Sequence, residues 1–271
     1  MRPLAKTFRE AIMKKQMWGI SLAVLVAALG SVGDARAQTG GAGLTIDGRI
    51  GVSAAIALAD GHIQSMVHSL QLLAMTEEVG SGNWERMLPL LTRLKEIQIP
   101  AVVFFALPDG SYYTVEKGKT DQNIKDRAYF PRVMAGGVAI GDLVVSRSTG
   151  KKVMVAAVPV KSGGKVIGAL GVSIHLDKLS ELLARELQLP PNMVVYAIDG
   201  KQGTTALHSV TRLIFEDPAK QKSETLTRAV KEMLSKEEGM VSYEFEGKRK
   251  KAYFKTSPLT GWRFALAVTT Q

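Results

Sequence analysis

The spacing of apolar positions in this chain changes from a helical pattern in its first part to short strand-like runs in the rest. Residues 45–79 carry apolar side chains at the spacing of an amphipathic helix: Ile56, Ile63, Met66, Val67, Leu70 and Leu73. A Gly-Ser-Gly break at 80–82 separates this helix from a second one over residues 83–97, for which Asn83 is a suitable N-cap. The sequence thus predicts a long helix and a shorter one ahead of the first strand.

From residue 99 onward, short apolar runs between glycine turns indicate antiparallel strands. AVVFFAL (101–107) and SYYTV (111–115) flank an Asp-Gly turn, which is typical of a β-hairpin. Three further strand-like runs, at 143–148, 152–160 and 165–175, are joined by Thr-Gly and Ser-Gly-Gly turns.

The segments between these strands follow from weaker patterns. Residues 117–122 are polar and are expected to form a loop, and residues 123–135 a short helix that Pro131 kinks or ends. The glycine-rich residues 136–141 are expected to be a flexible connection to the next strand. Asp177 is placed to cap a helix that stops before two prolines.

The second half of the chain repeats this order of elements. MVVYAIDGKQGTTALHS (193–209) is again strand, Asp-Gly turn and strand, and a helix at about 221–236 and three strand-like runs follow. The interval from the first Asp to a late Pro is 50 residues in one copy (109 to 159) and 59 in the other (199 to 258). We interpret this as two copies of one α+β unit led by a long helix; two unrelated meanders are the alternative.

The first 37 residues have the pattern of a secretory signal peptide. Residues 1–16 carry five basic side chains and one acidic side chain, residues 17–33 carry no charge, and Ala-Arg-Ala precedes Gln38. We expect cleavage after Ala37 and a periplasmic or secreted product. A retained membrane anchor is the alternative, although the apolar run is shorter than the ~20 residues of a spanning helix. No later segment is expected to span a membrane.

Composition places the rest of the chain among ordinary globular proteins. Hydrophobic residues make up 46% and charged residues 22%, which is enough apolar content for a buried core. The net charge is +10, but residues 1–37 hold six basic and two acidic residues, which leaves +6 spread along residues 38–271. That mild excess does not indicate a nucleic-acid partner. The chain has no cysteine, which excludes disulfides, thiol catalysis and thiolate metal sites.

No catalytic or metal-binding pattern is visible in the sequence. The four histidines lie alone in their segments, and His62 and His68 are six residues apart rather than the four that place two ligands on one helix face. There is no Gly-x-Ser-x-Gly elbow, P-loop or His-Glu-x-x-His motif. We therefore expect a binding protein without enzymatic activity, cofactor or metal.

The segment DRAYFPRV (126–133) holds the first candidate binding residues. Arg127 offers a planar fork of donors that suits a carboxylate. Tyr129 is placed to line the same cavity, with Phe130 packed behind it. The alternative for Arg127 is a surface ion pair with Asp126 or Asp121.

Other candidates come from the strands. Side chains alternate between the two faces of a strand, so only one of Tyr112 and Tyr113 faces inward, and we assign Tyr113 to the site. Ser146 and Ser173 lie within otherwise apolar runs and would contribute hydroxyl groups.

The order DRAYF (126–130), STGKKVMVAAVPV (148–160) and KVIGALGVSI (165–174), after a long N-terminal helix, resembles the double Cache domains of bacterial chemoreceptors and histidine kinases. The resemblance covers about residues 45–270. It implies an α+β fold in which a long N-terminal helix packs along two PAS-like antiparallel-sheet modules, the membrane-distal one binding a ligand and the membrane-proximal one relaying the signal. The expected parts are a signal peptide (1–37), a helical region (38–97), a distal-type module (98–176), and a linker helix with a proximal-type module (177–271).

Amino-acid-binding members of this family carry an Arg-x-aromatic-aromatic signature, a Tyr ahead of the Thr-Gly turn and an Asp in the last distal strand. Arg127, Tyr129 and Phe130 match the first element, but Val144 and Ser173 stand at the other two positions. The missing Asp leaves no evident acceptor for an α-amino group, which favours a carboxylate or another small anion as the ligand.

We therefore expect an exported sensor that binds a small anionic molecule in the distal module. The chain ends directly after its last strand, so we expect occupancy to be passed to a separate partner such as a membrane histidine kinase or chemoreceptor. A periplasmic protein-interaction adaptor with no ligand is the alternative.

Overall fold

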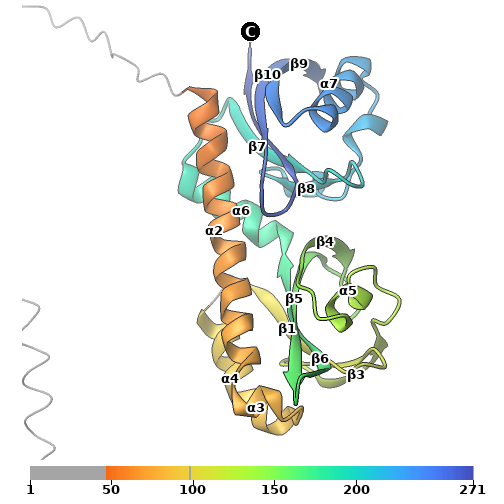
Figure 1. Cartoon of the computed structure of the whole chain (residues 1–271). Helices are drawn as coiled ribbons and strands as arrows, with labels where there is room; N and C mark the ends of the chain where they lie inside the picture. The colour runs from red at the N-terminus through yellow and green to blue at the C-terminus, as the bar shows by residue number, and fades with distance from the viewer. Residues whose placement is uncertain (1–46, 98, 271) are drawn as a thin grey trace, which may run out of the picture. The chain divides into compact units, whose positions relative to one another are not determined.

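The structure, a computed structural model, describes residues 47–97 and 99–270; the predicted signal peptide lies outside them. Helix α2 (Gly48–Ala74) packs against strands of both β-sheets (Figure 1). Among the described residues it alone is long and apolar enough to cross a membrane. Its stripe of apolar side chains is nevertheless buried in the protein core: Val52, Ala55, Ile56, Ala59, Ile63, Met66, Val67 and Leu70. We therefore describe α2 as a core helix.

The long helix predicted at 45–79 breaks after Ala74. Thr76 starts a separate short helix, α3 (Glu77–Gly80), because its hydroxyl accepts a hydrogen bond from the Val79 backbone N–H at 3.4 Å. Helix α4 (Trp84–Ile97) follows as predicted, and the Asn83 side-chain oxygen accepts from the first backbone N–H groups at 2.9 and 3.3 Å.

The first sheet has six antiparallel strands in the order β3-β2-β1-β6-β5-β4. Their bounds are β1 (Ala101–Ala106), β2 (Ser111–Thr114), β3 (Gly118–Asn123), β4 (Ala139–Val145), β5 (Lys152–Ser162) and β6 (Lys165–His175). The predicted apolar runs β1, β6 and β5 are adjacent in the sheet. Helices α2 and α4 contact this sheet, and a short helix, α5 (Phe130–Met134), contacts β4, β5 and β6.

Two predictions for this unit are wrong. Residues 117–122 contain β3, an edge strand paired with β2; its side chains are mostly exposed, so no apolar alternation marks it. The helix predicted at 123–135 is reduced to α5, and residues 124–129 form turns and bends. Pro131 lies in the first turn of α5, where its missing N–H removes no hydrogen bond, so it starts the helix instead of kinking or ending it.

Two boundaries also differ from the prediction. Strand β4 begins inside the segment 136–141, where Gly141 has a φ of +87° at an irregularity in the pairing with β5. Helix α6 (Leu176–Leu187) has His175 at its N-cap, without a side-chain cap. Asp177 therefore lies in the first turn, where its negative charge interacts favourably with the helix dipole.

The second sheet has the order β8-β7-β11-β10-β9, which is the topology of β2-β1-β6-β5-β4. This agreement supports the predicted repeat, although β3 has no counterpart among the strands of the described residues. The elements are β7 (Met193–Ile198), β8 (Thr205–His208), η1 (Thr211–Leu213), η2 (Pro218–Lys220), α7 (Glu224–Ser235), β9 (Glu238–Phe245), β10 (Lys248–Thr256) and β11 (Arg263–Thr269). The fold is α+β, with a long N-terminal helix on two antiparallel sheets, as predicted.

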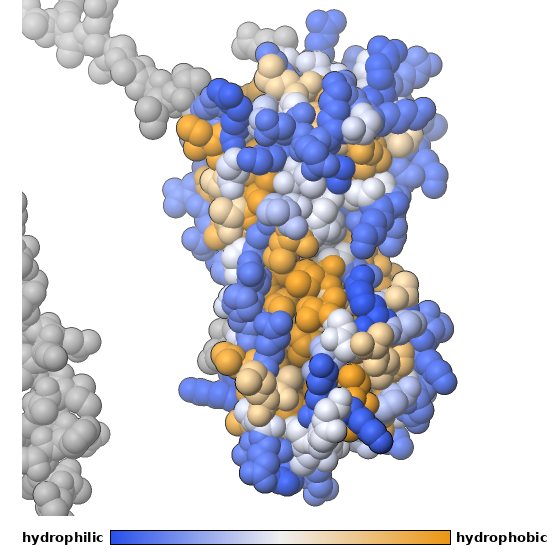
Figure 2. Space-filling model, in the orientation of Figure 1, coloured by the Kyte–Doolittle hydropathy of each residue, from blue (hydrophilic) through white to orange (hydrophobic). Residues whose placement is uncertain are grey.

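Contacts along α2 join the two sheets. Asp60 accepts a hydrogen bond from the Ser257 hydroxyl, between β10 and β11, at 2.8 Å. Farther along the helix, Leu72 and Met75 line a groove against β5 and are 69% and 83% exposed. In Figure 2, apolar side chains are exposed on the face where α2 meets the first sheet. The two sheets are also linked by a hydrogen bond that the Lys152 ammonium group of β5 donates to the Ile214 carbonyl oxygen.

Candidate ligand-binding site

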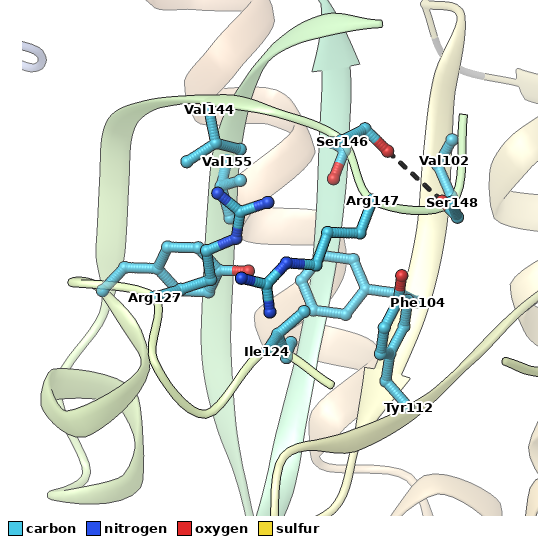
Figure 3. A pocket seen from close by; sticks show the side chains of 12 residues that line it. Val102, Phe104, Tyr112, Ile124, Arg127, Val144, Ser146, Arg147, Ser148 and Val155 are labelled. Atoms are coloured by element: carbon cyan, nitrogen blue, oxygen red, sulfur yellow. Dashed lines mark hydrogen bonds between the residues drawn. The ribbon is translucent and has the colours of Figure 1, made fainter. Parts of the chain in front are cut away.

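A polar cavity lies on the face of the first sheet opposite α2 and α4, under the turns of residues 124–129 and 146–148 (Figure 3). Strands β1, β2, β4, β5 and β6 each contribute at least one side chain to its lining. The lining residues are Val102, Phe104, Tyr112, Ile124, Arg127, Tyr129, Val144, Ser146, Arg147, Ser148, Val155 and Ser173. Four of the six residues predicted for the site are therefore brought together here.

Arg127 reaches the cavity from a turn rather than from the predicted helix. The Arg127 backbone N–H donates to the Ile124 carbonyl oxygen at 3.1 Å, and its carbonyl oxygen accepts from the Phe130 N–H at 2.9 Å. Its guanidinium group donates to the Val145 carbonyl oxygen at 2.7 Å. This bond to a neutral carbonyl leaves the positive charge of Arg127 uncompensated. The alternative, a surface ion pair with Asp126, is not what the structure shows.

Asp126 is instead paired with Arg147. The two Arg147 terminal nitrogens donate to the two carboxylate oxygens of Asp126 at 2.8 and 2.7 Å, and one of them also donates to the Asn123 carbonyl oxygen. These hydrogen bonds lower the pKa of the Asp126 carboxyl group below its usual value. Asp126 is largely exposed and does not line the cavity, whereas Arg147 does.

Tyr129 and Phe130 occupy different places. Tyr129 lines the cavity and is 4% exposed, and burial raises the pKa of its phenol, which therefore stays neutral and able to donate. Phe130 is buried in the neighbouring apolar cluster with Val133 and does not reach the cavity surface. Phe130, one of the six residues predicted for the site, therefore does not line the cavity and packs behind it instead.

Hydroxyl groups complete the polar lining. Ser146 and Ser173 are both buried, and the Ser146 hydroxyl lies 3.2 Å from that of Ser148. Val155 lies directly opposite Ser173 in the sheet and adds an apolar wall. The cavity therefore combines two guanidinium groups, hydroxyl groups and apolar side chains, and none of the described residues that line it carries a carboxylate.

The assignment of Tyr113 does not hold in the structure. Its ring stacks on Trp84 of α4 with ring centroids 5.1 Å apart, on the helix-covered face of the sheet. Tyr112 lines the cavity in its place, with its ring edge-on to Phe104. Alternation along the strand was correct, but the sequence alone does not say which face the helices cover.

Arg147 is the charged cavity residue that sequence reasoning missed. Alternation places it on the face opposite Ser146, away from the cavity. Strand β4 ends at Val145, however, and the chain turns there, so the two-residue period no longer applies to residues 146–148. The Ser-Arg-Ser-Thr-Gly turn is the one signal that marks this change of direction.

The free space in the cavity is small, about 20 Å³. A water molecule fits in such a space, whereas sites for small organic molecules are many times larger. The two arginine side chains reach into this region, as Figure 3 shows, so their positions determine how much room a ligand has. Within the described residues no cluster of side chains is arranged to hold a metal ion.

The second sheet carries a cavity of different chemistry. Its lining is mainly aromatic and apolar and includes Tyr196 and His208, and no arginine or lysine is found among the described residues that form it. The rings of these two residues stack with centroids 5.7 Å apart. Burial lowers the pKa of His208 to about 4, so this imidazole is neutral at physiological pH. The cationic cavity is thus a feature of the first sheet.

A long helix along two PAS-like sheets, one of which holds a polar cavity, defines the class of tandem extracytoplasmic sensor modules. The dCache_1 model of the Cache domain matches residues 50–271, and the chain belongs to this family. Cache domains are extracytoplasmic, non-catalytic modules that bind small molecules and act as sensors.

Solved structures share this fold at low sequence identity. The ligand-binding domain of the Campylobacter jejuni chemoreceptor Tlp3, in complex with 4-methylisoleucine, is 14% identical with a TM-score of 0.62, over 82% of this chain and 89% of that one. That of the Pseudomonas aeruginosa PAO1 chemoreceptor PctB, in complex with L-Arg, is 15% identical with a TM-score of 0.65, over 82% and 86%. That of the Pseudomonas fluorescens chemoreceptor CtaA, with L-isoleucine, is 14% identical with a TM-score of 0.59, over 82% and 89%. No curated protein matches the sequence.

Proposed function

We propose that this protein is an exported Cache sensor whose first-sheet cavity binds a small organic carboxylate and whose occupancy is read by a separate signalling partner. The observation that carries the proposal is the Arg127 guanidinium group, which faces a cavity that is lined by hydroxyl groups and, in the described part of the chain, by no carboxylate. Arginine binds a carboxylate through two parallel, charge-assisted hydrogen bonds, which are stronger than its present bond to a neutral carbonyl.

The same lining argues against an α-amino acid. Tlp3, PctB and CtaA are described in complexes with amino acids or a close analogue. In this chain Val144 and Ser173 occupy the positions at which the family resemblance expects a Tyr and an Asp, and both line the cavity. An ammonium group placed there would lose its hydration without gaining an anionic partner, which is unfavourable in a buried site.

Three ligands of equal carbon number test this proposal: propionate, L-lactate and L-alanine, titrated calorimetrically into the protein. We expect propionate or L-lactate to bind and L-alanine not to bind. Arg127→Gln should weaken carboxylate binding at least about tenfold, because hydrogen bonds to a charged group are lost. Arg93→Gln is the matched control, since Arg93 lies exposed on α4 in an ion pair with Glu96 at 3.0 Å. Tighter binding of L-alanine than of propionate would refute the proposal.

The cavity volume favours a second candidate function, a periplasmic adaptor that binds another protein and no small molecule. A space of about 20 Å³ admits no carboxylate unless an arginine moves. If no carboxylate or amine raises the melting temperature of the parent protein or of the Arg127→Gln variant, the adaptor is the better description.

Export and the signalling partner are parts of the same proposal. Cleavage after Ala37 would give a mature chain that begins at Gln38, which N-terminal sequencing of the exported protein tests. A retained leader would make the protein membrane-anchored instead. We expect a membrane histidine kinase or chemoreceptor as the partner, and crosslinking in cells with and without the bound carboxylate tests this.

A further inference from the structure

The cavity contains a second guanidinium group that a site for one carboxylate does not require. Arg147 lines the same space as Arg127, and Figure 3 shows the two guanidinium groups directed into one region from different turns. Like charges in one cavity repel each other, so their proximity needs compensation by an anion. Among the described residues, Asp126 provides that anion for Arg147 alone.

The Asp126–Arg147 pair has the geometry of a bound carboxylate. Both Asp126 oxygens accept from Arg147 at 2.8 and 2.7 Å, which is the bidentate arrangement of arginine with a carboxylate ligand. The Arg127 side chain, in contrast, makes one hydrogen bond within the described residues, to the Val145 carbonyl oxygen. Arg147 thus already binds a carboxylate, that of Asp126, whereas Arg127 has no carboxylate partner among the described residues.

Exchange of Asp126 for a ligand carboxylate is energetically easy. The Asp126 side chain is 67% exposed, so its carboxylate returns to water when the pair opens. Opening the pair breaks two charge-assisted hydrogen bonds, and a ligand carboxylate on Arg147 would replace both of them. Arg147 would keep its bond to the Asn123 carbonyl oxygen, which holds the side chain near the cavity.

From these observations we infer that the site takes a small dicarboxylate, with one carboxylate on Arg127 and the other on Arg147, and that Asp126 is an internal competitor for Arg147. This inference rests on the proposed carboxylate-binding function and specifies its ligand class. Ser146 and Ser173 supply hydroxyl groups beside the two cations. Arg147 is then the residue that separates dicarboxylates from monocarboxylates.

Succinate and butyrate test the inference, because they share a four-carbon skeleton and differ in the number of carboxylates. In calorimetric titrations at 0.15 M salt we expect the parent protein to bind succinate at least about tenfold more tightly than butyrate. Arg147→Gln should remove this preference and change butyrate affinity by less than about twofold. Arg127→Gln should weaken both ligands, and Arg93→Gln should change neither.

Asp126→Asn tests the competition directly. Asparagine keeps the size of the side chain but cannot form the bidentate ion pair, so succinate affinity should rise severalfold while butyrate affinity changes less. Thermal unfolding of each variant shows whether it is folded, and the double variant Asp126→Asn/Arg147→Gln should lose the gain.

The outcomes separate this inference from the proposed function. Equal affinities for succinate and butyrate in the parent protein, or an unchanged preference in a folded Arg147→Gln variant, would overturn the dicarboxylate inference and leave carboxylate binding in place. Binding of neither compound by the parent protein would overturn the proposed function, and the dicarboxylate inference with it.

Discussion

Gly171 lies in β6 directly opposite Phe104 of β1, and a methyl group at this position would collide with the wall of the cavity. A Cβ atom built on Gly171 would lie 2.3 Å from Phe104 Cζ and 3.0 Å from the Ala156 carbonyl oxygen. The carbonyl belongs to the backbone of β5 and cannot retreat, so the ring has to move by about 1 Å to reach an ordinary contact distance of ~3.5 Å. The Phe104 ring lies edge-on to Tyr112, with centroids 6.3 Å apart, and both rings line the cavity.

We predict that Gly171→Ala destabilises the fold by about 1–3 kcal/mol, the usual range for overpacking a well-packed core. For a chain of this size, that corresponds to a fall in melting temperature of about 2–12 °C. The displaced ring would also reduce the cavity, whose free space is about 20 Å³, and so weaken propionate or succinate binding.

Gly168→Ala is a matched control on the other face of the same strand. Its Cβ atom would lie 2.6 Å from the Ala106 carbonyl oxygen and 2.7 Å from Phe105 Cζ, so the backbone of β1 has to shift there as well as the ring. Phe105 belongs to the core under α2 and not to the cavity. Chemical denaturation and ligand titration of both variants should therefore show a loss of stability in each, at least as large in Gly168→Ala, with a loss of affinity in Gly171→Ala alone. A Gly171→Ala protein as stable as the parent, or equal losses of affinity in both variants, would refute this reasoning.

Two further predictions concern a titrating group and a corrected assignment. Because burial lowers the pKa of His208 from 6.5 to about 4, the unfolded chain takes up a proton in this range that the folded chain does not, and stability falls as the pH falls; at 1.36 kcal/mol per unit this amounts to about 3 kcal/mol. Urea unfolding at pH 7 and pH 4 should show that His208→Phe removes this part of the pH dependence, and identical pH profiles would contradict the assignment. Tyr113→Ala should destabilise the protein by about 1–2 kcal/mol, because it loses the ring stacked on Trp84, yet leave carboxylate affinity unchanged. Tyr112→Ala should weaken binding, as measured by the same titrations.

The sequence predicts this fold well wherever burial produces a regular pattern. The runs that became β1, β5 and β6 are nearly continuous apolar segments because these strands are covered on both faces. Asn83 and the apolar stripe of α4 follow the rules of capping and helical period just as directly. The repeat was visible because each copy preserves the same order of turns.

Elements that are fixed by backbone pairing or tertiary contact left no such pattern. Strand β3 bears exposed polar side chains, and its hydrogen bonds to β2 alone make it a strand. In the segment before α5, the hydrogen bonds of Arg127 to Ile124 and Phe130 replace the helix that the composition suggested. Arg147 enters the cavity through a change of chain direction, and no side-chain periodicity encodes that.

Helix α2 has a consequence for how the length of this chain can vary. The part of its buried stripe around Ile56 and Asp60 lies against the β10–β11 end of the second sheet, and the part around Leu70 lies over β5 of the first. One residue inserted between these two parts of the stripe would rotate them against each other by about 100°, so that the buried side chains of one part would face water. Seven inserted residues would restore the face but shift the contacts by about 10 Å along the axis. The number of residues in α2 thus sets the distance between its contacts with the two sheets. We therefore expect the fold to tolerate apolar substitutions in α2 but neither insertions nor deletions.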